Sequence, residues 1–345
     1  MKKIFLLTYA RTNLGDDLFM KIILEKFSNI DFYITVPDYK FIEKMDNKYD
    51  NLHVIIDEDT DSKLYEMDEE LYDGYIYAGG SIFMEGGKVY NLSEKFYEFI
   101  KRCKRKNIPF FYISNNYGPY QTEEYFNLSR KNFKECTDIC FRDIYSYDLF
   151  KDIATVRYAP DLVFCLELDK PEVIKDTVGI SVIFRDEEFN KRYISFLKNN
   201  IENYLKLGKE VTLFSFCKHE GDEKMAYEVL ELFDSPKVKV ICYDGDIEKF
   251  IKEYSQMEYI MTDRFHSLIL SLIARQKIFV TSYSNKIDNI INDLKLDLPI
   301  LRTENIYEND LVDLKKFKMI SDATIKKISE EAKGQMSAIQ KFLES

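Results

Sequence analysis

Short runs of β-branched and aromatic residues alternate with longer amphipathic stretches along almost the whole chain, and this alternation limits the possible fold more than any other feature. The short runs have the length of strands, and the longer stretches place their apolar residues on one face of a helix. Such alternation predicts parallel sheets covered by helices, the α/β class. In the first half the predicted strands are 4–9, 31–36, 53–57, 75–78, 109–114, 138–141 and 156–159, with helices such as 16–27, 92–106 and 144–150 between them.

The alternation is interrupted once, over residues 166–176, which are acidic, contain Pro171 and show no sustained periodicity. A chain of 345 residues has room for two domains of ordinary size. We therefore expect two facing doubly wound parallel-sheet domains, residues 1–168 and 177–320, joined by this linker and followed by a C-terminal helix within 321–345. In the second half the predicted strands are 178–184, 210–216, 237–242, 259–262 and 277–282, and the predicted helices are 188–207, 222–233, 247–254, 265–274 and 288–294.

The bulk composition argues against several classes of protein. The formal net charge is -11, whereas a general nucleic-acid binder carries a basic surface. The six cysteines form no Cys-x-x-Cys pair and lie mostly in apolar runs, which is typical of free buried thiols in a reducing compartment. No apolar run reaches the ~18 residues that span a bilayer, and the polar residues after position 10 favour a first strand over a signal peptide. We expect a soluble protein in the cytoplasm.

The aromatic content does not by itself indicate sugar binding. Tyr and Phe number 25 and 26, but Ile, Lys and Asn are abundant as well, and Trp, a strong stacking residue for sugars, is absent. The pattern is typical of a coding bias toward AT-rich codons.

Candidate binding residues follow the predicted strands, where ligands of doubly wound sheets bind, and with two domains those edges can face each other across a cleft. The first group is Asn13, Gly15 and Asp16, between the first strand and its helix. Gly15 suits a tight turn, Asp16 or Asp17 suits a helix cap, and a helix start favours an anion. An ordinary strand-to-helix turn is the alternative. The glycine fingerprint of dinucleotide-binding proteins is absent.

Two further groups follow later strands. The pair Gly79 and Gly80 allows the backbone to approach a ligand or a neighbouring helix closely. Asn115 and Asn116 can hydrogen-bond hydroxyl groups, and Gly118-Pro119 predicts a turn after them. Tight packing and a solvated turn are the respective alternatives.

Arg142 and Asp143 follow the predicted strand 138–141. The planar guanidinium of Arg142 can bind a carboxylate or phosphate through two hydrogen bonds. Asp143 can cap the next helix, and a plain ion pair between the two residues is the alternative interpretation.

The strongest group is Arg264 and His266, at the end of a predicted strand and the start of an apolar helix. A helix start attracts an anion, and the proton affinity of His266 there depends on whether an anion is bound, which suits a general acid. A satisfied buried histidine is the alternative. Tyr283 and Lys286 follow the next strand, so that Lys286 adds a second cation at the same sheet edge. The sequence contains no clear metal-binding cluster.

An ordered set of motifs extends from about residue 4 to 295: Asn13-Leu14-Gly15-Asp16, Gly79-Gly80, Gly118-Pro119, Arg142-Asp143 with Ser146, Pro160-Asp161 with Phe164, Arg264-Phe265-His266-Ser267, and Tyr283 with Lys286. In this set the chain resembles the polysaccharide pyruvyl transferases. Three positions depart from the family pattern: Ser81 stands in place of a third glycine, Phe265 in place of a leucine, and Asn115-Asn116 in place of a glycine-rich stretch. The last departure concerns the identity of the acceptor more than the chemistry.

The resemblance implies a fold similar to the GT-B glycosyltransferases and the transfer of pyruvate from phosphoenolpyruvate to two hydroxyls of a sugar, as a ketal, in cell-surface polysaccharide synthesis. Arg142, Arg264 and Lys286 would bind the donor, and His266 would act as the acid or as a donor to the departing phosphate. Asp16 or Asp143 would be the base. The resemblance implies no cofactor, with phosphoenolpyruvate on the C-terminal domain and a sugar or lipid-linked oligosaccharide acceptor on the N-terminal domain. The alternatives are a nucleotide-sugar-dependent glycosyltransferase of the same fold and a non-catalytic glycan-binding relative.

The basic run 101–106 has two interpretations. Cations at a helix C-terminus complement the helix dipole. Alternatively, they contact anionic lipid headgroups at the inner face of the cell membrane, as would suit a lipid-linked acceptor. The sequence does not specify the oligomeric state.

Overall fold

A computed structural model describes residues 2–57, 67–86, 94–169, 171–282, 284–306 and 310–344. The chain forms two compact units. Unit 1 comprises Met1–Arg11, Asp16–Cys165 and Ile328–Ser345, and unit 2 comprises Thr12–Gly15 and Leu166–Lys327. Both units are parallel-sheet α/β structures, so the predicted fold class is confirmed.

Unit 1 contains a seven-stranded sheet in the order β3-β2-β1-β4-β5-β6-β7, and every pair of neighbours is parallel. All seven predicted strands are present, as β1 (Lys3–Leu7), β2 (Asp31–Val36), β3 (Leu52–Ile56), β4 (Gly74–Phe83), β5 (Phe110–Tyr117), β6 (Asp138–Phe141) and β7 (Val156–Tyr158). The α-helices in the described part of this region are α1 (Leu14–Lys26), α2 (Glu43–Asp46), α3 (Glu94–Arg105), α4 (Glu123–Glu135) and α5 (Ile144–Phe150).

Unit 2 contains a six-stranded parallel sheet in the order β10-β9-β8-β11-β12-β13. Five strands were predicted, and β13 was not, because three residues are too few to show a periodicity. The strands are β8 (Ile174–Ser181), β9 (Glu210–Ser215), β10 (Val238–Cys242), β11 (Met257–Thr262), β12 (Lys277–Ser282) and β13 (Ile300–Arg302), and the helices between them are α6 (Glu187–Lys206), α7 (Asp222–Leu230), α8 (Ile247–Ser255), α9 (Phe265–Ile273) and α10 (Asn285–Asp293).

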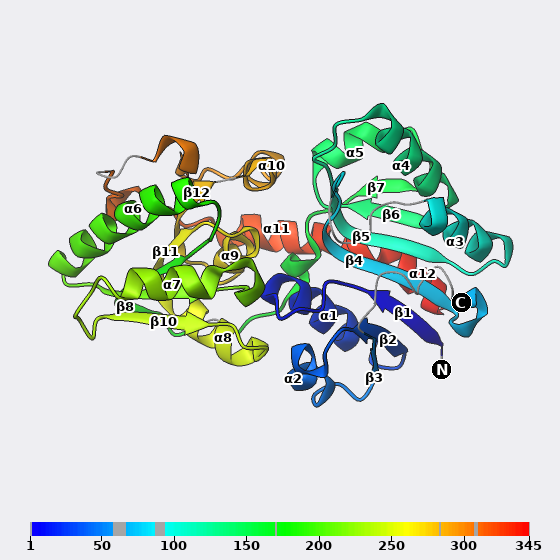
Figure 1. Ribbon diagram of the computed structural model, residues 1–345, viewed down its shortest axis with the longest axis horizontal. Coiled ribbons are helices and arrows are strands. Elements are labelled where there is room, and N and C mark those ends of the chain that lie inside the picture. Colours follow the sequence, from blue (N-terminus) through cyan, green and yellow to red (C-terminus); the bar gives the residue numbers. More distant parts are fainter. Residues whose placement is uncertain are drawn as a thin grey trace. The chain divides into compact units, whose positions relative to one another are not determined.

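Each sheet has one point at which the strand order reverses. In unit 1 the first strand, β1, lies between β2 and β4, and in unit 2 the first strand, β8, lies between β9 and β11. Loops that leave the carboxyl ends of such a pair turn to opposite faces of the sheet and leave room for a ligand between them. Figure 1 shows β1 between β2 and β4. The candidate residues that follow β1 and β11, and the Gly79-Gly80 pair near the end of β4, therefore lie beside these two reversal points.

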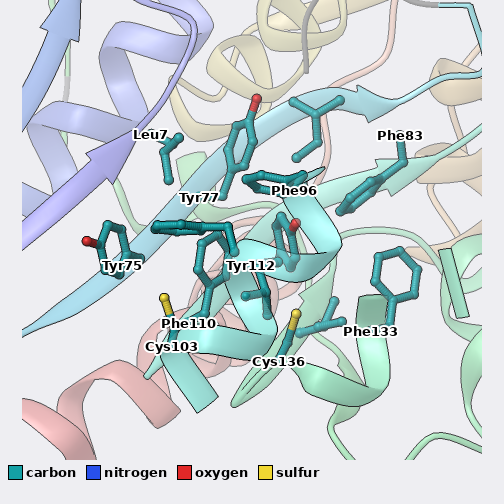
Figure 2. Close-up of a cluster of buried hydrophobic side chains, with 14 of the residues drawn as sticks. Leu7, Tyr75, Tyr77, Phe83, Phe96, Cys103, Phe110, Tyr112, Phe133 and Cys136 are labelled. Atoms are coloured by element: carbon teal, nitrogen blue, oxygen red, sulfur yellow. The ribbon is translucent and has the colours of Figure 1, made fainter. Parts of the chain in front are cut away.

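The core of unit 1 is largely aromatic, which explains part of the high Tyr and Phe content (Figure 2). Tyr75, Tyr77 and Tyr112 are almost completely buried, and the hydroxyl of Tyr75 donates to the backbone carbonyl of Glu69 at 3.2 Å. Successive strand residues face opposite sides of a sheet. Accordingly, Phe110 packs edge-on against Phe96 of α3, whereas the next residue in β5 packs against the C-terminal segment.

The predicted C-terminal helix consists of two α-helices, α11 (Asp322–Ala332) and α12 (Ser337–Glu344), joined by a 3-10 turn at Lys333–Met336. Gln335 of this turn is fully buried in unit 1. It accepts a hydrogen bond from the N–H of Ser114 at 2.9 Å and donates to the carbonyl of Ala159 at 2.6 Å. The chain end thereby satisfies backbone groups at the carboxyl ends of β5 and β7.

Three of the sequence predictions fall partly or wholly outside the described residues. The predicted helix 92–106 is described from Glu94, the predicted linker 166–176 includes the undescribed residue 170, and the candidate residue Tyr283 is not described.

The basic run 101–106 lies in the last turns of α3 and just beyond it. Arg102 and Lys106 pair with the carboxylate of Glu69, and Lys104 pairs with Glu135. These pairs and the position at a helix C-terminus agree with the dipole interpretation, while contact with lipid stays a prediction. Among the described helices, none has the length and apolar character needed to cross a membrane.

Candidate anion site at the start of helix α9

The loop between β11 and α9 is held by buried hydrogen bonds. The backbone N–H of Asp263 donates to Ser181 Oγ at the end of β8, at 2.8 Å, and the Tyr193 hydroxyl of α6 donates to the Asp263 carboxyl group. Burial raises the pKa of Asp263 well above its usual range, although the Tyr193 hydrogen bond and the charge of Arg264 oppose the shift. These two hydrogen bonds fix the direction in which the next residues, Arg264 to His266, leave the sheet.

The guanidinium of Arg264 lies between two carboxylates of unit 2. One guanidinium nitrogen donates to Glu220 and the other to Asp222. Asp222 is fully buried, and its second oxygen accepts the backbone N–H groups of Phe216 and Cys217 at 3.2 and 3.1 Å. Burial raises the pKa of Asp222 to about 6, even though Arg264 favours the ionised form. Glu220 is exposed, so a ligand can displace it more easily than Asp222.

The segment that precedes α1 belongs to the same site. The backbone N–H of Leu14 donates to the carbonyl of Phe216 at 3.2 Å, and the side chain of Asn13 donates to Glu220 at 3.3 Å. These bonds explain why residues 12–15 cluster with unit 2. Asn13 and Gly15 of the first predicted motif therefore belong to the same unit as Arg264 and His266 of the strongest one.

Gly15 lies directly against the ring of His266. A Cβ atom added to Gly15 would lie 1.8 Å from His266 Nδ1, so only glycine leaves space for the imidazole. The predicted reason for this glycine, a tight turn, is wrong: Gly15 lies within α1, and the residue with positive φ is Thr12. The predicted cap is also wrong, because α1 begins at Leu14 and the side chain of Asn13 accepts the N–H of Gly15 at 3.1 Å.

In unit 1, Gly79 and Gly80 have φ of 81° and 78°, a conformation that favours glycine. A Cβ atom on Gly79 would lie 2.1 Å from the ring of Phe19, so this glycine serves close packing against α1. A Cβ atom on Gly80 would lie 3.5 Å from the carboxylate of Asp16. The sequence placed this pair after the strand, but both glycines lie within β4, where they bring the backbone close to one of the two predicted bases.

Asn115, Asn116 and Arg142 form a buried network in unit 1. Asn115 donates to the carbonyl of Gly79 at 2.8 Å, and Arg142 donates to Asn116 at 2.6 Å and to Asp161 at 3.0 Å. The side chains of Arg142 and Asp161 are 4% and 0% exposed, so the charge of Arg142 is balanced by a partner that water cannot reach. In this structure these three predicted ligand-binding residues hold the carboxyl ends of β4, β5 and β6 together.

Asp143 caps α5, as predicted. Its carboxylate accepts the backbone N–H of Ser146 at 2.7 Å and the Ser146 hydroxyl at 3.0 Å. Because Ser146 Oγ in turn accepts the N–H of Tyr117, the cap also fixes the end of β5. Both oxygens of the Asp143 carboxylate accept hydrogen bonds, so this carboxylate is poorly placed to act as a base. Asp16 is therefore the stronger of the two candidates.

Lys286 is the second residue of α10, which follows β12, the parallel neighbour of β11. Arg264 and Lys286 therefore follow adjacent carboxyl ends of the same sheet, as the sequence predicted. Asp222 and Glu220, the partners of Arg264, were not predicted as site residues. The sequence signal for these two residues is weak: both follow a predicted strand, as many acidic residues do. Within the described part of the chain, no three His, Cys, Asp or Glu residues are grouped as metal ligands.

The family model of the polysaccharide pyruvyl transferases matches residues 13–285 of the chain. No curated protein matches significantly. Among solved structures, the chain is similar to a Listeria monocytogenes protein assigned as a UDP-N-acetylglucosamine 2-epimerase, with 11% identity, a TM-score of 0.62, and coverage of 99% of this chain and 94% of that one. It is also similar to the UDP-N-acetylglucosamine 2-epimerase of Neisseria meningitidis (10% identity, TM-score 0.57, coverage 96% and 99%) and to Acinetobacter baumannii MurG (12% identity, TM-score 0.50, coverage 100% and 98%). These similarities show the fold, that of GT-B glycosyltransferases and epimerases.

Substitution of Gly15 by alanine should destabilise the protein by roughly 1–3 kcal/mol, because the new methyl group overlaps the His266 ring. In a His266→Ala background the same substitution should cost little, since the ring is gone and the backbone of Gly15 is helical. Urea unfolding of the four proteins forms a double-mutant cycle. Equal costs in the two backgrounds would show that the imidazole does not occupy this space.

Asp222 should make the stability of the protein depend on pH. Since its pKa is raised from 3.8 to about 6 by folding, its contribution is fully present below pH 4 and is lost as the pH rises through 6. The loss should amount to up to roughly 3 kcal/mol. Asp222→Asn should remove this component, so the difference in unfolding free energy between variant and wild type should change between pH 4 and 6.5. Parallel pH profiles would contradict the raised pKa.

Proposed function

The chain belongs to the polysaccharide pyruvyl transferase family, and from this premise we propose that it transfers pyruvate from phosphoenolpyruvate to two hydroxyls of one sugar, as a cyclic ketal, in the synthesis of cell-surface polysaccharide. The observation that carries the proposal is the cluster of Arg264 and His266 at the start of α9, against Gly15. It joins a cation, a titratable imidazole and a helix start in one unit.

In the proposed reaction, the methylene carbon of phosphoenolpyruvate takes up a proton and becomes the ketal methyl group. One sugar hydroxyl attacks the central carbon, the bond from that carbon to the phosphate oxygen breaks, and the phosphate leaves with the electron pair. The second hydroxyl then closes the ring. The two hydroxyls release two protons; one replaces the proton used on the methylene carbon and the other leaves with the phosphate.

His266 is the proposed acid for the first proton transfer. It lies in the first turn of α9, where the free N–H groups of the helix favour an anion, and a bound phosphate in turn favours the protonated imidazole. Binding of the substrate would therefore favour the protonated form of His266, which is the form that the reaction needs. Contact with Gly15 holds the ring in one place, which supports a positioned proton donor.

Arg264 is the proposed ligand of the donor anion, together with Lys286 at the start of α10. Its guanidinium is occupied by Glu220 and Asp222, so binding requires an exchange. Glu220 is 42% exposed at its side chain, whereas Asp222 is fully buried and held by two backbone N–H groups. We expect the donor to displace Glu220, while Asp222 keeps the guanidinium oriented.

The acceptor is proposed to bind unit 1, with Asp16 as the base. The carboxylate of Asp16 lies beside Gly80 at the reversal point of the first sheet. Asn115 and Asn116 are buried and hydrogen-bonded within unit 1, so they stabilise this sheet edge rather than bind the acceptor directly.

His266→Ala should lower the rate of phosphate release from phosphoenolpyruvate and a sugar acceptor by about 10²–10⁴-fold, the usual contribution of a positioned acid. The double variant with Arg264→Ala should also lose calorimetric binding of phosphoenolpyruvate. His53→Ala is the matched control, because His53 lies in β3 and pairs with Asp31. Near-normal turnover of His266→Ala would remove the acid role. Absence of phosphoenolpyruvate binding by the wild type, with and without candidate sugars, would favour the nucleotide-sugar alternative.

Glu220→Gln should tighten the binding of phosphoenolpyruvate by up to about fivefold, since an exposed ion pair is worth less than ~1 kcal/mol and its loss frees Arg264 for the ligand. Glu223→Gln, in the first turn of α7, is the control; its carboxylate pairs with Lys218 instead. Calorimetric titration measures both. If Glu220→Gln weakened binding, the carboxylate would be holding Arg264 in position rather than competing with the ligand.

A further inference from the structure

A hollow with a volume of about 290 Å³ lies at the carboxyl edge of the sheet in unit 2. Its lining comes from the segment after β8, from α6, and from the ends of β12 and β13. Neither Arg264 nor His266 is part of the lining. Its size is near the lower end of the range for small-molecule sites, roughly 300–1,000 Å³.

Three arginines line this hollow, which we call the arginine pocket: Arg185, Arg192 and Arg302. Arg185 stacks over the ring of Phe189 at 5.4 Å, and Arg302 pairs with Asp288 at 2.8 Å. Arg192 is partly buried. Guanidinium groups bind phosphate through charge-assisted hydrogen bonds, so the three arginines make this pocket suited to a phosphate group.

The start of α10 adds donors to the same pocket. Ser284, the residue before this nine-residue helix, makes no side-chain capping bond, and both Ser284 and Asn285 line the pocket. The first N–H groups of a helix attract phosphate when no cap occupies them. Together with Arg192, these N–H groups are hydrogen-bond donors of the kind that bind phosphate.

The pocket also contains acceptors. Asp186, Glu188 and Glu304 line it. These three carboxylates balance the charges of the three arginines, so the pocket is less suited to a small ligand that carries only anionic groups, such as phosphoenolpyruvate. A sugar can donate its hydroxyls to them, and sugar phosphates combine both chemistries in one molecule.

We propose that the arginine pocket binds a phosphate-bearing sugar, with the phosphate on Arg192 and the start of α10 and the sugar hydroxyls on the acidic side chains. This inference goes beyond the proposed reaction, because it concerns a ligand other than phosphoenolpyruvate and a pocket without the catalytic histidine.

Calorimetric titration with three probes tests the proposal: glucose 1-phosphate, inorganic phosphate and methyl α-glucoside. Glucose 1-phosphate should bind at least about tenfold more tightly than either other probe, since each of these lacks one half of the contacts. Equal affinity for inorganic phosphate would show a simple anion site and overturn the sugar assignment. No binding of glucose 1-phosphate at millimolar concentration would overturn the whole proposal.

Arg192→Ala should weaken the binding of glucose 1-phosphate about tenfold or more, the usual effect of losing a charged hydrogen-bond donor. Lys191→Ala is the matched control, because Lys191 is the neighbouring cation on α6, is exposed and pairs with Glu187. Arg302→Ala, whose side chain is half exposed, provides a second variant that should fold normally and also bind more weakly. If both arginine variants bound like the wild type, the pocket would not be the binding site.

Phosphoenolpyruvate distinguishes this proposal from the proposed function. It should bind Arg192→Ala with unchanged affinity, since Arg264 and His266 stay intact, whereas glucose 1-phosphate should bind that variant more weakly. Loss of both ligands in Arg192→Ala would show that the pocket is the donor site. That result would overturn the inference and leave pyruvyl transfer standing.

Discussion

The ion pair between Asp222 and Arg264 connects the segments from which the candidate site is built. A fully buried carboxylate is costly unless it is paired and hydrogen-bonded, and Asp222 meets this requirement through Arg264 and two backbone N–H groups after β9. The carbonyl of Phe216 in the same segment accepts the N–H of Leu14, which brings the start of α1 to the start of α9. The contact between His266 and the glycine at position 15 follows from this chain of bonds.

The two arginines that sequence reasoning selected differ in how their charges are balanced. Arg142 is buried and its acidic partner Asp161 is equally buried, so an incoming anion would have to break a pair that water does not reach. Arg264 has one buried partner and one exposed partner, Glu220. Of the two arginines, only Arg264 has a guanidinium that is fixed by a buried partner and also has an exposed partner that a ligand can replace. We therefore interpret Arg142 as a residue that holds the sheet edge of unit 1 together, and Arg264 as the residue that meets the ligand.

Much of the candidate site could be predicted, because parallel strands bring their carboxyl ends to one edge and any polar group just after a strand is a candidate. This rule selected His266, Arg264 and Lys286 as candidates. It could not find the carboxylates that neutralise Arg264, since acidic residues after strands are common and nothing local distinguishes Asp222 from Asp244. It also assigned the wrong reason to Gly15, because a glycine required by a side chain far along the chain looks the same in sequence as a glycine required by a turn.

The sequence by itself determined the two parallel sheets, the order of the elements and the sheet edge at which the candidate residues lie, because strand and helix periodicities are local properties of the chain. The short strand β13 and the 3-10 turn after α11 could not be predicted from the sequence, since three or four residues carry no periodicity. Only the tertiary structure decided which residues share a site, which charges are already balanced, and that the arginine pocket combines cations with hydroxyl acceptors. Those properties depend on distances between segments remote in sequence, and such distances are set by packing and buried hydrogen bonds rather than by any local pattern.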